Sequence, residues 1–270
     1  MAQHGTVFLM YHELSLPDRQ LCHAEPGYVR YVVAASDFRQ HMKRFAAEGW
    51  RCRNVSQSLE SFHTNSVCIT FDDGCETDLL CAGPVLQELG QAATFYITVA
   101  FLNQPGYLTH AQVRSLRSAE FEVGCHSMTH PYLTDIDDTR LRVETGEAKD
   151  RLEQITGAPV QHFSCPGGRW DRRVLEAVKR AGFRSMATSR TAMNLASTDP
   201  FALNRVAVLR GTSVEQVMRT GRGQGLFLAQ WKESARDAAK RMLGNSAYDA
   251  IRGLVLGSKT DSTSPPDGHT

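Results

Sequence analysis

The sequence lacks any long apolar run, since no window of about 18 residues is free of charged and polar side chains, as a membrane-spanning helix would require. The first stretch, 1–12, also lacks the basic segment and extended apolar core of an export signal. These absences lead us to expect a cytoplasmic protein.

Neither sign of charge dominates, because 30 basic side chains face 29 acidic ones and the formal net charge is +1. This balance gives no reason to expect a nucleic-acid partner. The seven cysteines are an odd number without a C-x-x-C pair, so they indicate neither a disulfide framework nor a zinc knuckle. Reduced thiols are the simplest interpretation.

What the sequence does contain is a regular alternation of strand-like and helix-like segments, which predicts a parallel sheet and, with about seven units, a closed or nearly closed β/α barrel. A doubly wound open sheet is the alternative, but the segment after the first strand, 11–20, has no Gly-rich turn. The expected strands are 6–11, 67–71, 92–99, 120–124, 161–164, 184–188 and 204–209, and the expected helices are 37–48, 77–89, 109–118, 137–156, 171–181 and 213–219.

The domain organisation follows from these patterns. Residues 1–228 are predicted to form one barrel domain, and 229–257 an amphipathic helical segment that packs against it. Docking of that segment at a membrane surface is a second possibility. Residues 258–270 are polar and rich in Pro and Ser, and we expect them to be disordered. The oligomeric state is not fixed by the sequence.

Polar side chains that can carry chemistry follow two of the expected strands. Asp72 and Asp73 end one strand, and His126 and His130 follow another at a spacing that can aim both imidazoles at one ion. In a parallel barrel the loops after the strand ends build the active site. Taken alone, the Asp-Asp pair indicates a turn and the two histidines a surface feature, but together they predict a divalent metal site of two His and one Asp.

The two neighbouring acids can divide the work at such a site. Asp73 would bind the ion with His126 and His130, and an open coordination position would make the site catalytic rather than structural. Asp72 would remain free to take a proton from a water molecule.

Two motifs resemble those of the polysaccharide deacetylases, the NodB-homology group of carbohydrate esterase family 4. They are Thr70-Phe71-Asp72-Asp73 and His126-Ser127-Met128-Thr129-His130. The resemblance covers about residues 6–210. It implies a distorted (β/α)7-type barrel in a single domain, a divalent metal, usually Zn²⁺, on Asp73, His126 and His130, and Asp72 as general base.

The third family motif, R-x-P-[aromatic]-G, is altered here. Ser164 stands in place of the arginine that orients the base, and Gly167 in place of the aromatic residue, while Pro166 and Gly168 keep the motif's positions. The resemblance implies an oxyanion donor at the Gly167 N–H, which glycine can still supply. Arg205 is the candidate replacement for the arginine; an ordinary surface arginine is the alternative.

The final family motif, L-x-H near the C-terminus, is absent, because the only histidine after position 200 is His269. In a family subset with circularly permuted motif order, the acid histidine lies near the N-terminus, and Tyr11-His12 fits that pattern. We therefore expect His12 to be the general acid and Glu13 to steer its imidazole. The alternative is a histidine that only caps the strand.

The function expected from this resemblance is hydrolysis of an N-acetyl, or an O-acetyl, group on a saccharide, by a hydrolase that acts on carbon–nitrogen bonds other than peptide bonds. A saccharide-binding barrel with impaired catalysis is the alternative, because the motif arginine is missing. An amidohydrolase barrel is excluded by the absence of an H-x-H on the first strand.

Overall fold

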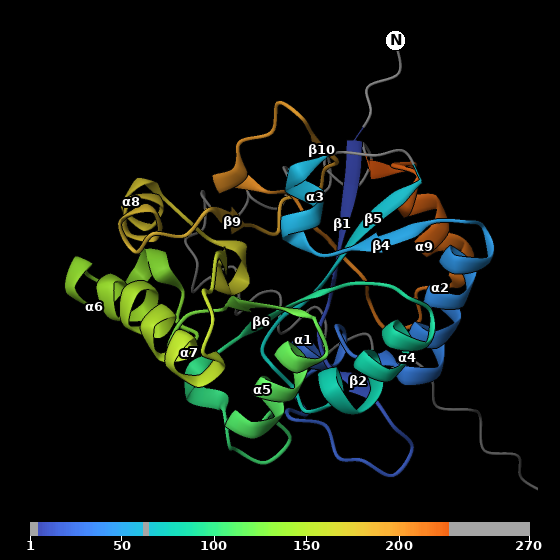
Figure 1. Cartoon of the computed structure of the whole chain (residues 1–270), viewed down its shortest axis with the longest axis horizontal. Coiled ribbons are helices and arrows are strands. Elements are labelled where there is room, and N and C mark those ends of the chain that lie inside the picture. Colours follow the sequence, from blue (N-terminus) through green and yellow to red (C-terminus); the bar gives the residue numbers. More distant parts are fainter. Residues whose placement is uncertain (1–4, 62–64, 227–270) are drawn as a thin grey trace, which may run out of the picture. The chain divides into compact units, whose positions relative to one another are not determined.

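The computed structural model describes residues 5–61 and 65–226 of the chain. Within them, nine strands form one curled sheet whose main path is β10-β1-β5-β6-β7-β8-β9, with β11 beside β1 and β4 beside β5 (Figure 1). The strands are β1 Gly5–Tyr11, β4 Arg51–Arg53, β5 Ser66–Phe71, β6 Thr94–Ile97, β7 Glu122–Cys125, β8 His162–Ser164, β9 Ser185–Ala187, β10 Asn194–Leu195 and β11 Val206–Ala207, and a separate parallel pair is formed by β2 Leu14–Ser15 and β3 Val33–Ala34.

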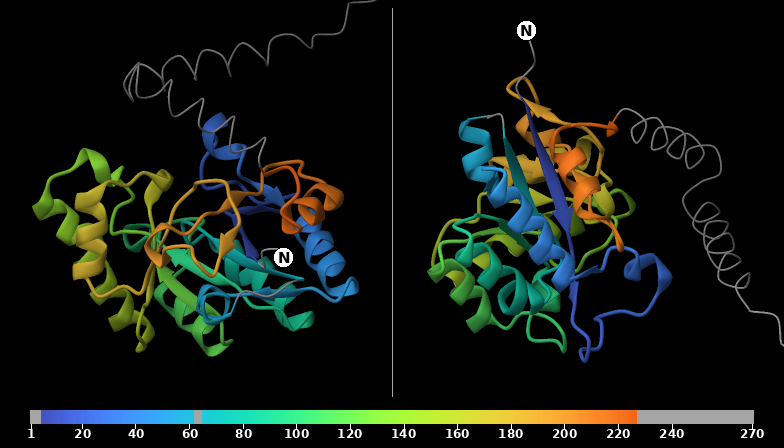
Figure 2. Two further views of the ribbon diagram at one scale, coloured as in Figure 1. Left: turned by 90° about the horizontal axis from the view of Figure 1, so that it is seen from above. Right: turned by 90° about the vertical axis from the view of Figure 1, so that its right-hand side faces the viewer.

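Helices lie around the outside of the curled sheet (Figures 1 and 2). Among them, α2 packs against α9, α5 against α7 and α6 against α8. The α-helices are α1 Pro26–Val29, α2 Ala35–Ala47, α3 Val55–Glu60, α4 Gly83–Glu88, α5 His110–Ser118, α6 Asp138–Arg142, α7 Ala148–Thr156, α8 Arg172–Arg180 and α9 Val214–Gly221. Two π-helical turns, η1 Asp78–Ala82 and η4 Val143–Glu147, continue into α4 and α7, and short 3₁₀ turns are η2 Val99–Phe101, η3 Leu133–Asp135, η5 Pro166–Gly168 and η6 Pro200–Ala202.

The sheet curls nearly into a closed barrel. The pairings along its main path are parallel except that of β1 with β10. A single parallel bridge joins Ala187 of β9 to Leu203, and the chain then enters β11, which pairs with β1. This near-closure confirms the predicted barrel and rules out the doubly wound open sheet.

Local signals explain why the elements form where they do. All six residues of β5 are buried, as expected for a central parallel strand. Asp171 accepts a hydrogen bond from the Val174 N–H and so caps α8, while Gly157 ends α7 in a left-handed conformation with φ of 66°. These caps were readable in the sequence because they are local.

Several elements differ from the expectation. The predicted strands 92–99 and 204–209 are shortened to Thr94–Ile97 and Val206–Ala207. The unit made of β4 and α3 was not predicted, because only Cys52 of the three β4 residues is buried and the strand therefore shows no apolar pattern.

The described residues of the predicted 1–228 domain belong to one compact unit. The predicted helical segment 229–257 and the predicted disordered tail 258–270 lie outside the described residues. Among the helices that the structure does describe, none has both the length and the apolar character needed to cross a bilayer.

Candidate active site

The candidate site residues gather at one edge of the sheet because parallel strands end there side by side. Asp72 and Asp73 follow β5, and His126 follows β7. His12 follows β1, which pairs with β5 along Val7–Tyr11 and Val67–Phe71. The edge therefore brings together residues that are more than a hundred positions apart in the sequence.

Asp73, His126 and His130 form a compact cluster of potential metal ligands. The Asp73 Oδ1 atom lies 3.6 Å from His126 Nε2 and 3.4 Å from His130 Nε2. That oxygen is buried and has no hydrogen-bond partner. A buried carboxylate oxygen without a partner is costly, so a ligand at this point would satisfy it.

The protonation of the two imidazoles fits this interpretation. The Nδ1 atom of His126 lies 2.8 Å from the Ser164 carbonyl oxygen, which can only accept, so Nδ1 carries the proton and the Nε2 lone pair faces Asp73. Burial lowers the pKa of His126 to about 3 and also lowers the pKa of His130, so both rings are neutral near pH 7. Their contacts with Asp73 are therefore not ion pairs, and the donor set suits a divalent cation.

The backbone at this cluster adopts left-handed conformations that side chains usually avoid. Asp73 has φ of 81°, Ser127 of 70° and His130 of 63°. Such conformations cost about 1–3 kcal/mol each and are kept where the surrounding structure imposes them. Three such conformations occur in the segments that carry the candidate ligands. They indicate that the fold accepts backbone strain here in order to place these side chains.

Glu144, which the sequence analysis did not identify, holds the turn between the two histidines. Its buried carboxylate accepts hydrogen bonds from the N–H groups of Met128 at 2.9 Å and Thr129 at 2.7 Å, and from the Thr129 hydroxyl at 2.6 Å. Arg140 donates to the same carboxylate at 3.1 Å. No spacing rule connects Glu144 of η4 with this turn, so the sequence carried no signal for it.

Arg205 reaches Asp72 with both arms of its guanidinium, at 2.7 and 2.8 Å. The side chain is buried, with 1% of its surface exposed, so the alternative of an ordinary surface arginine is wrong. The same Arg205 donates to the Ser164 hydroxyl at 2.8 Å. The serine that stands in the motif position of the arginine thus helps to hold the guanidinium that comes from the segment just before β11.

The charge of Arg205 controls the state of Asp72. Burial by itself would raise the pKa of Asp72, but Arg205 and His126 outweigh it and hold that pKa well below its usual range. Asp72 is therefore ionised near neutral pH. This arrangement provides a carboxylate with a fixed orientation beside the candidate metal cluster.

His12 lies at the same edge, and its buried Nδ1 atom has no hydrogen-bond partner. Its ring packs against Tyr31 with a centroid distance of 4.8 Å. Glu13, expected to steer this imidazole, instead accepts hydrogen bonds from Arg19, the Cys22 N–H and the Tyr28 hydroxyl. The Tyr31 ring is thus a packing neighbour of the His12 imidazole.

The Pro166–Gly168 turn keeps the altered third motif in a tight conformation. Gly167 has φ of 60°, and a Cβ atom there would lie 2.7 Å from the Tyr132 ring, so a larger residue would clash with it. Tyr132 is partly exposed and carries the Arg169 guanidinium 3.8 Å from its ring centroid. An aromatic ring is therefore present beside Gly167, supplied by the segment after His130. The Gly168 N–H donates to the Cys165 carbonyl at 2.8 Å, so it closes the turn.

Comparison with known proteins agrees with the fold and with the resemblance found in the sequence. The family model described as "Polysaccharide deacetylase" matches residues 60–186, which include Asp72, Asp73, His126, His130 and Gly167. This central part of the chain is similar to the polysaccharide deacetylase family. His12 and Arg205 fall outside the matched range, so their assignment depends on geometry.

Individual relatives are similar over part of their length. A chitooligosaccharide deacetylase of Azorhizobium caulinodans is 30% identical over 129 residues, which are 46% of this chain and 59% of that protein. YxkH of Bacillus subtilis is 25% identical over 67% of each chain. The chain thus spans about three fifths to two thirds of the length of these two relatives.

Solved structures show the same fold. The deacetylase PplD of Streptococcus pyogenes has a TM-score of 0.72 at 20% identity, covering 82% of this chain and 99% of that one. A polysaccharide deacetylase of Bacillus cereus also has a TM-score of 0.72, at 24% identity, covering 81% of this chain and 69% of that one. The distorted barrel is therefore a fold that this chain shares with both of these structures.

Proposed function

We propose that this chain is a metal-dependent deacetylase that hydrolyses the N-acetyl group of a sugar in a polysaccharide or a glycoconjugate precursor. The observation that carries the proposal is the buried Asp73 Oδ1, which lacks a hydrogen-bond partner and faces the neutral Nε2 atoms of His126 and His130. Asp73, His126 and His130 would hold the cation, and Zn²⁺ suits this mixed nitrogen and oxygen donor set. When bound, the cation would supply Lewis acidity toward a water molecule and the acyl carbonyl.

The residues of the chain would then divide three tasks. Asp72, ionised and clamped by Arg205, accepts the proton of the attacking water. The Gly167 N–H donates to the carbonyl oxygen of the acyl group, on which the negative charge develops. His12 donates a proton to the departing nitrogen, whose poor leaving ability makes an acid necessary.

The names of two relatives support an N-acetylated amino sugar as the substrate. Besides the Azorhizobium protein, a peptidoglycan-N-acetylglucosamine deacetylase of Bacillus cereus is 29% identical over 126 residues, which are 46% of this chain and 56% of that protein. Hydrolysis of such a group would release acetate and leave a free amine on the sugar. A cytoplasmic location, and with it a biosynthetic precursor as substrate, remains part of this proposal.

The alternative of a saccharide-binding barrel without catalysis rested on the missing motif arginine. Arg205 supplies a guanidinium to Asp72 from the segment just before β11, which removes the reason for that alternative. Deacetylation is therefore the function that the contacts favour.

The proposal is tested by incubating the Zn²⁺-loaded protein with N-acetylglucosamine oligomers of two to six sugars and measuring released acetate and product mass. We expect a loss of about 42 Da per event, the mass of an acetyl group exchanged for hydrogen, as the hydrolytic reaction class requires. The Asp73→Asn variant should release no acetate and bind the ion poorly. Binding of the oligomers without acetate release by the metal-loaded protein would favour the binding barrel.

A further inference from the structure

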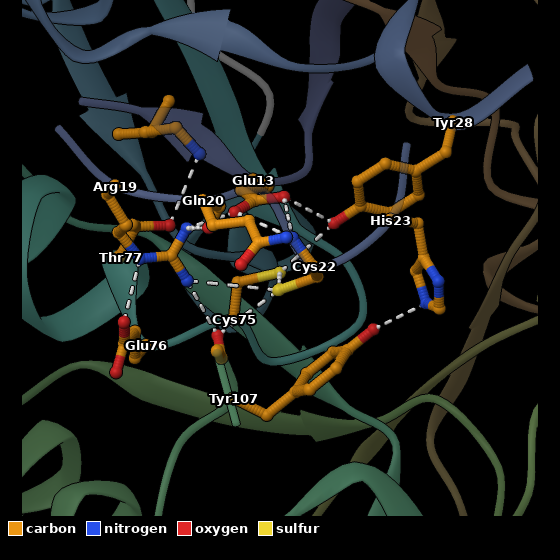
Figure 3. Close-up of polar contacts among 12 residues, drawn as sticks. Glu13, Arg19, Gln20, Cys22, His23, Tyr28, Cys75, Glu76, Thr77 and Tyr107 are labelled. Carbon is orange, nitrogen blue, oxygen red and sulfur yellow. Dashed lines mark hydrogen bonds and ion pairs between the residues drawn. The ribbon is translucent and has the colours of Figure 1, made fainter. Parts of the chain in front are cut away.

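A second polar cluster is formed by Glu13, by the segment that follows it and by the loop after β5 (Figure 3). It contains Glu13, Cys22 and Cys75, whose potential ligand atoms lie within 4.8 Å of one another. Cys75 comes two residues after Asp73, whereas Cys22 belongs to the segment between β2 and α1. The cluster thus joins the segment that carries His12 to the segment that carries Asp72 and Asp73.

The two sulfur atoms of this cluster are close neighbours although 53 positions separate them in the sequence. Their Sγ atoms lie 3.8 Å apart, in direct contact. Cys75 is fully buried, whereas Cys22 is half-buried and can be reached from solvent. The pair therefore combines one accessible thiol with one enclosed thiol.

The Cys22 side chain itself is held against the neighbouring loop, although the residues on either side of it are mostly exposed. Its thiol lies 3.2 Å from the Gly106 carbonyl oxygen. Gly106 has φ of 85°, and a Cβ atom at this position would lie 2.8 Å from the Cys22 sulfur. A larger residue at 106 would push Cys22 away, so the glycine permits the approach of the two chain segments.

The second cluster is not a good metal site, because the Arg19 guanidinium already occupies the position of a cation beside Glu13 and Cys22. The buried Glu13 carboxylate accepts hydrogen bonds from Arg19, from the Cys22 N–H at 3.1 Å and from the Tyr28 hydroxyl at 2.8 Å (Figure 3). Arg19 also lies 3.8 Å from the Cys22 sulfur. A metal would have to displace this guanidinium, whereas Asp73 of the candidate active site has an oxygen without any partner. The reactive feature of the second cluster is therefore its pair of thiols.

We propose that Cys22 and Cys75 are a redox-active dithiol that closes reversibly to a disulfide. The oxidant is a low-molecular-weight disulfide. The Cys22 thiolate attacks one of its sulfurs and displaces the other as a thiolate. Cys75 then loses its proton to water and attacks the Cys22 sulfur, and the second small thiolate departs. Two protein thiols are thus oxidised to one disulfide while one small disulfide is reduced to two thiols.

The surroundings of Cys22 support its role as the attacking thiol. The hydrogen bond with Cys75 lowers the pKa of Cys22, and the nearby Arg19 guanidinium acts in the same direction, although burial opposes them. A larger thiolate fraction speeds exchange with a disulfide. Tyr28, whose hydroxyl lies 3.5 Å from the Cys75 sulfur, helps to enclose the second thiol.

Closure of this disulfide would fix two segments of the barrel to each other. One carries His12 and the other carries Asp72 and Asp73, yet neither Cys22 nor Cys75 belongs to the proposed metal triad. The cross-link can therefore be measured without any assay of deacetylation.

The test treats the purified full-length protein with oxidised glutathione and then follows intact mass, peptide map and thermal unfolding. We expect a loss of about 2 Da, a peptide that links Cys22 to Cys75, and reversal by dithiothreitol. Because the closed loop spans 53 positions, the Tm should rise on the order of 10 °C.

Three single variants make the test specific. Cys75→Ser should retain a glutathione adduct on Cys22, and Cys22→Ser should form neither the adduct nor the link. Cys81→Ser removes another half-buried thiol and should behave as the wild type. The proposal is overturned if the wild type keeps a stable glutathione adduct on Cys22 or links Cys22 to a different cysteine. It is equally overturned if Cys22 stays unmodified, or if the wild type binds a second Zn²⁺ that Cys22→Ser loses.

Discussion

Two buried carboxylate–histidine clusters lie at opposite ends of the parallel strands of the sheet, and β7 contributes a residue to each. At the carboxyl ends, Asp73 faces His126 and His130. At the amino ends, Glu122 of β7 lies 3.4 Å from the Nε2 atom of His162 of β8. Each cluster combines a carboxylate with imidazole, but the hydrogen bonding around the two clusters differs.

Both oxygens of the Glu122 carboxylate accept hydrogen bonds from the protein. It accepts hydrogen bonds from the N–H groups of Val55 at 3.0 Å and Ser56 at 3.3 Å, which begin α3, and from the Thr94 hydroxyl. His162 is held as well, with Ser56 on one ring nitrogen and the Ser185 hydroxyl on the other, both at 2.8 Å. Every polar atom of this pair has a partner within the protein, so the cluster joins α3 to the sheet and leaves nothing for a ligand.

This difference shows that a buried carboxylate next to a histidine does not by itself identify a metal-binding or catalytic site. A buried carboxylate whose oxygens are all satisfied stabilises the fold, whereas Asp73 Oδ1 is buried without a partner and faces two neutral imidazoles. In barrels of this kind the carboxyl ends of the strands carry the chemistry and the amino ends carry stability. Four substitutions test whether the two ends of these strands differ in this way.

The largest effect is expected for Asp72→Asn at the carboxyl end. Loss of the proton acceptor should reduce kcat on the order of 10³-fold or more, because general-base catalysis contributes roughly 10²–10⁴-fold. Bound Zn²⁺ should remain near one equivalent, since Asp72 is not in the proposed ligand set. Rates of acetate release and metal content together check this, and a variant that loses its metal would show that Asp72 is a ligand.

Arg205→Ala should lower the free energy of unfolding by about 3–5 kcal/mol, because it leaves the buried Asp72 carboxylate without its partner. Arg184→Ala is the matched control: Arg184 is exposed and donates to Gln161 at 3.0 Å, and its loss should change stability by about 0.5 kcal/mol or less. Urea unfolding measures both variants. Equal small losses would mean that the Arg205 pair contributes no more than a surface contact.

His12→Ala should reduce amide hydrolysis by about 10²-fold, the usual contribution of an acid catalyst. An activated aryl acetate, whose leaving group needs no proton, should lose much less. Steady-state kinetics on the two substrates separates a catalytic from a structural role. The same loss on both substrates would assign His12 to packing against Tyr31.

The smallest effect is expected for Glu122→Gln at the amino ends of the strands, where about 1–3 kcal/mol of the free energy of unfolding should be lost with kcat unchanged.

The same variant should also change how stability depends on pH. Burial by itself would raise the pKa of Glu122, but its contacts with His162 and Ser56 lower that pKa on balance. A lowered folded-state pKa means that this stability is present above the unfolded pKa and is lost as pH falls through the folded value. Unfolding measured across pH 2–7 should therefore show a smaller acid-dependent loss in the variant than in the wild type; an altered kcat would break the comparison.

The sequence predicted those features that depend on local pattern. The buried strand β5, the Asp171 cap and the Gly157 stop are written in neighbouring residues, and the paired motifs led to Asp73, His126 and His130. Features that join distant segments left no such pattern. Arg205 contacts Asp72, which lies 133 positions away in the sequence. The sequence suggested Arg205 as the replacement for the motif arginine, but only the structure gives its contact with Asp72.

Glu144 and Glu122 illustrate the same limit. Each is a carboxylate that satisfies backbone N–H groups of a segment elsewhere in the fold, and nothing in its own neighbourhood distinguishes it from an exposed glutamate. Likewise, the thiols of Cys22 and Cys75 meet only because the segment after β2 packs on the loop after β5. Long-range hydrogen bonding and packing, which are set by the fold, decide these roles.

Metal binding tests the central claim most directly. The purified protein, stripped with a chelator and titrated with Zn²⁺, should bind one equivalent at the triad. His130→Ala should weaken that binding by roughly 100-fold or more, whereas Glu122→Gln should leave it unchanged, because its cluster is already satisfied. Undiminished stoichiometric binding in His130→Ala, or equal weakening in both variants, would contradict the distinction between the two ends of the strands.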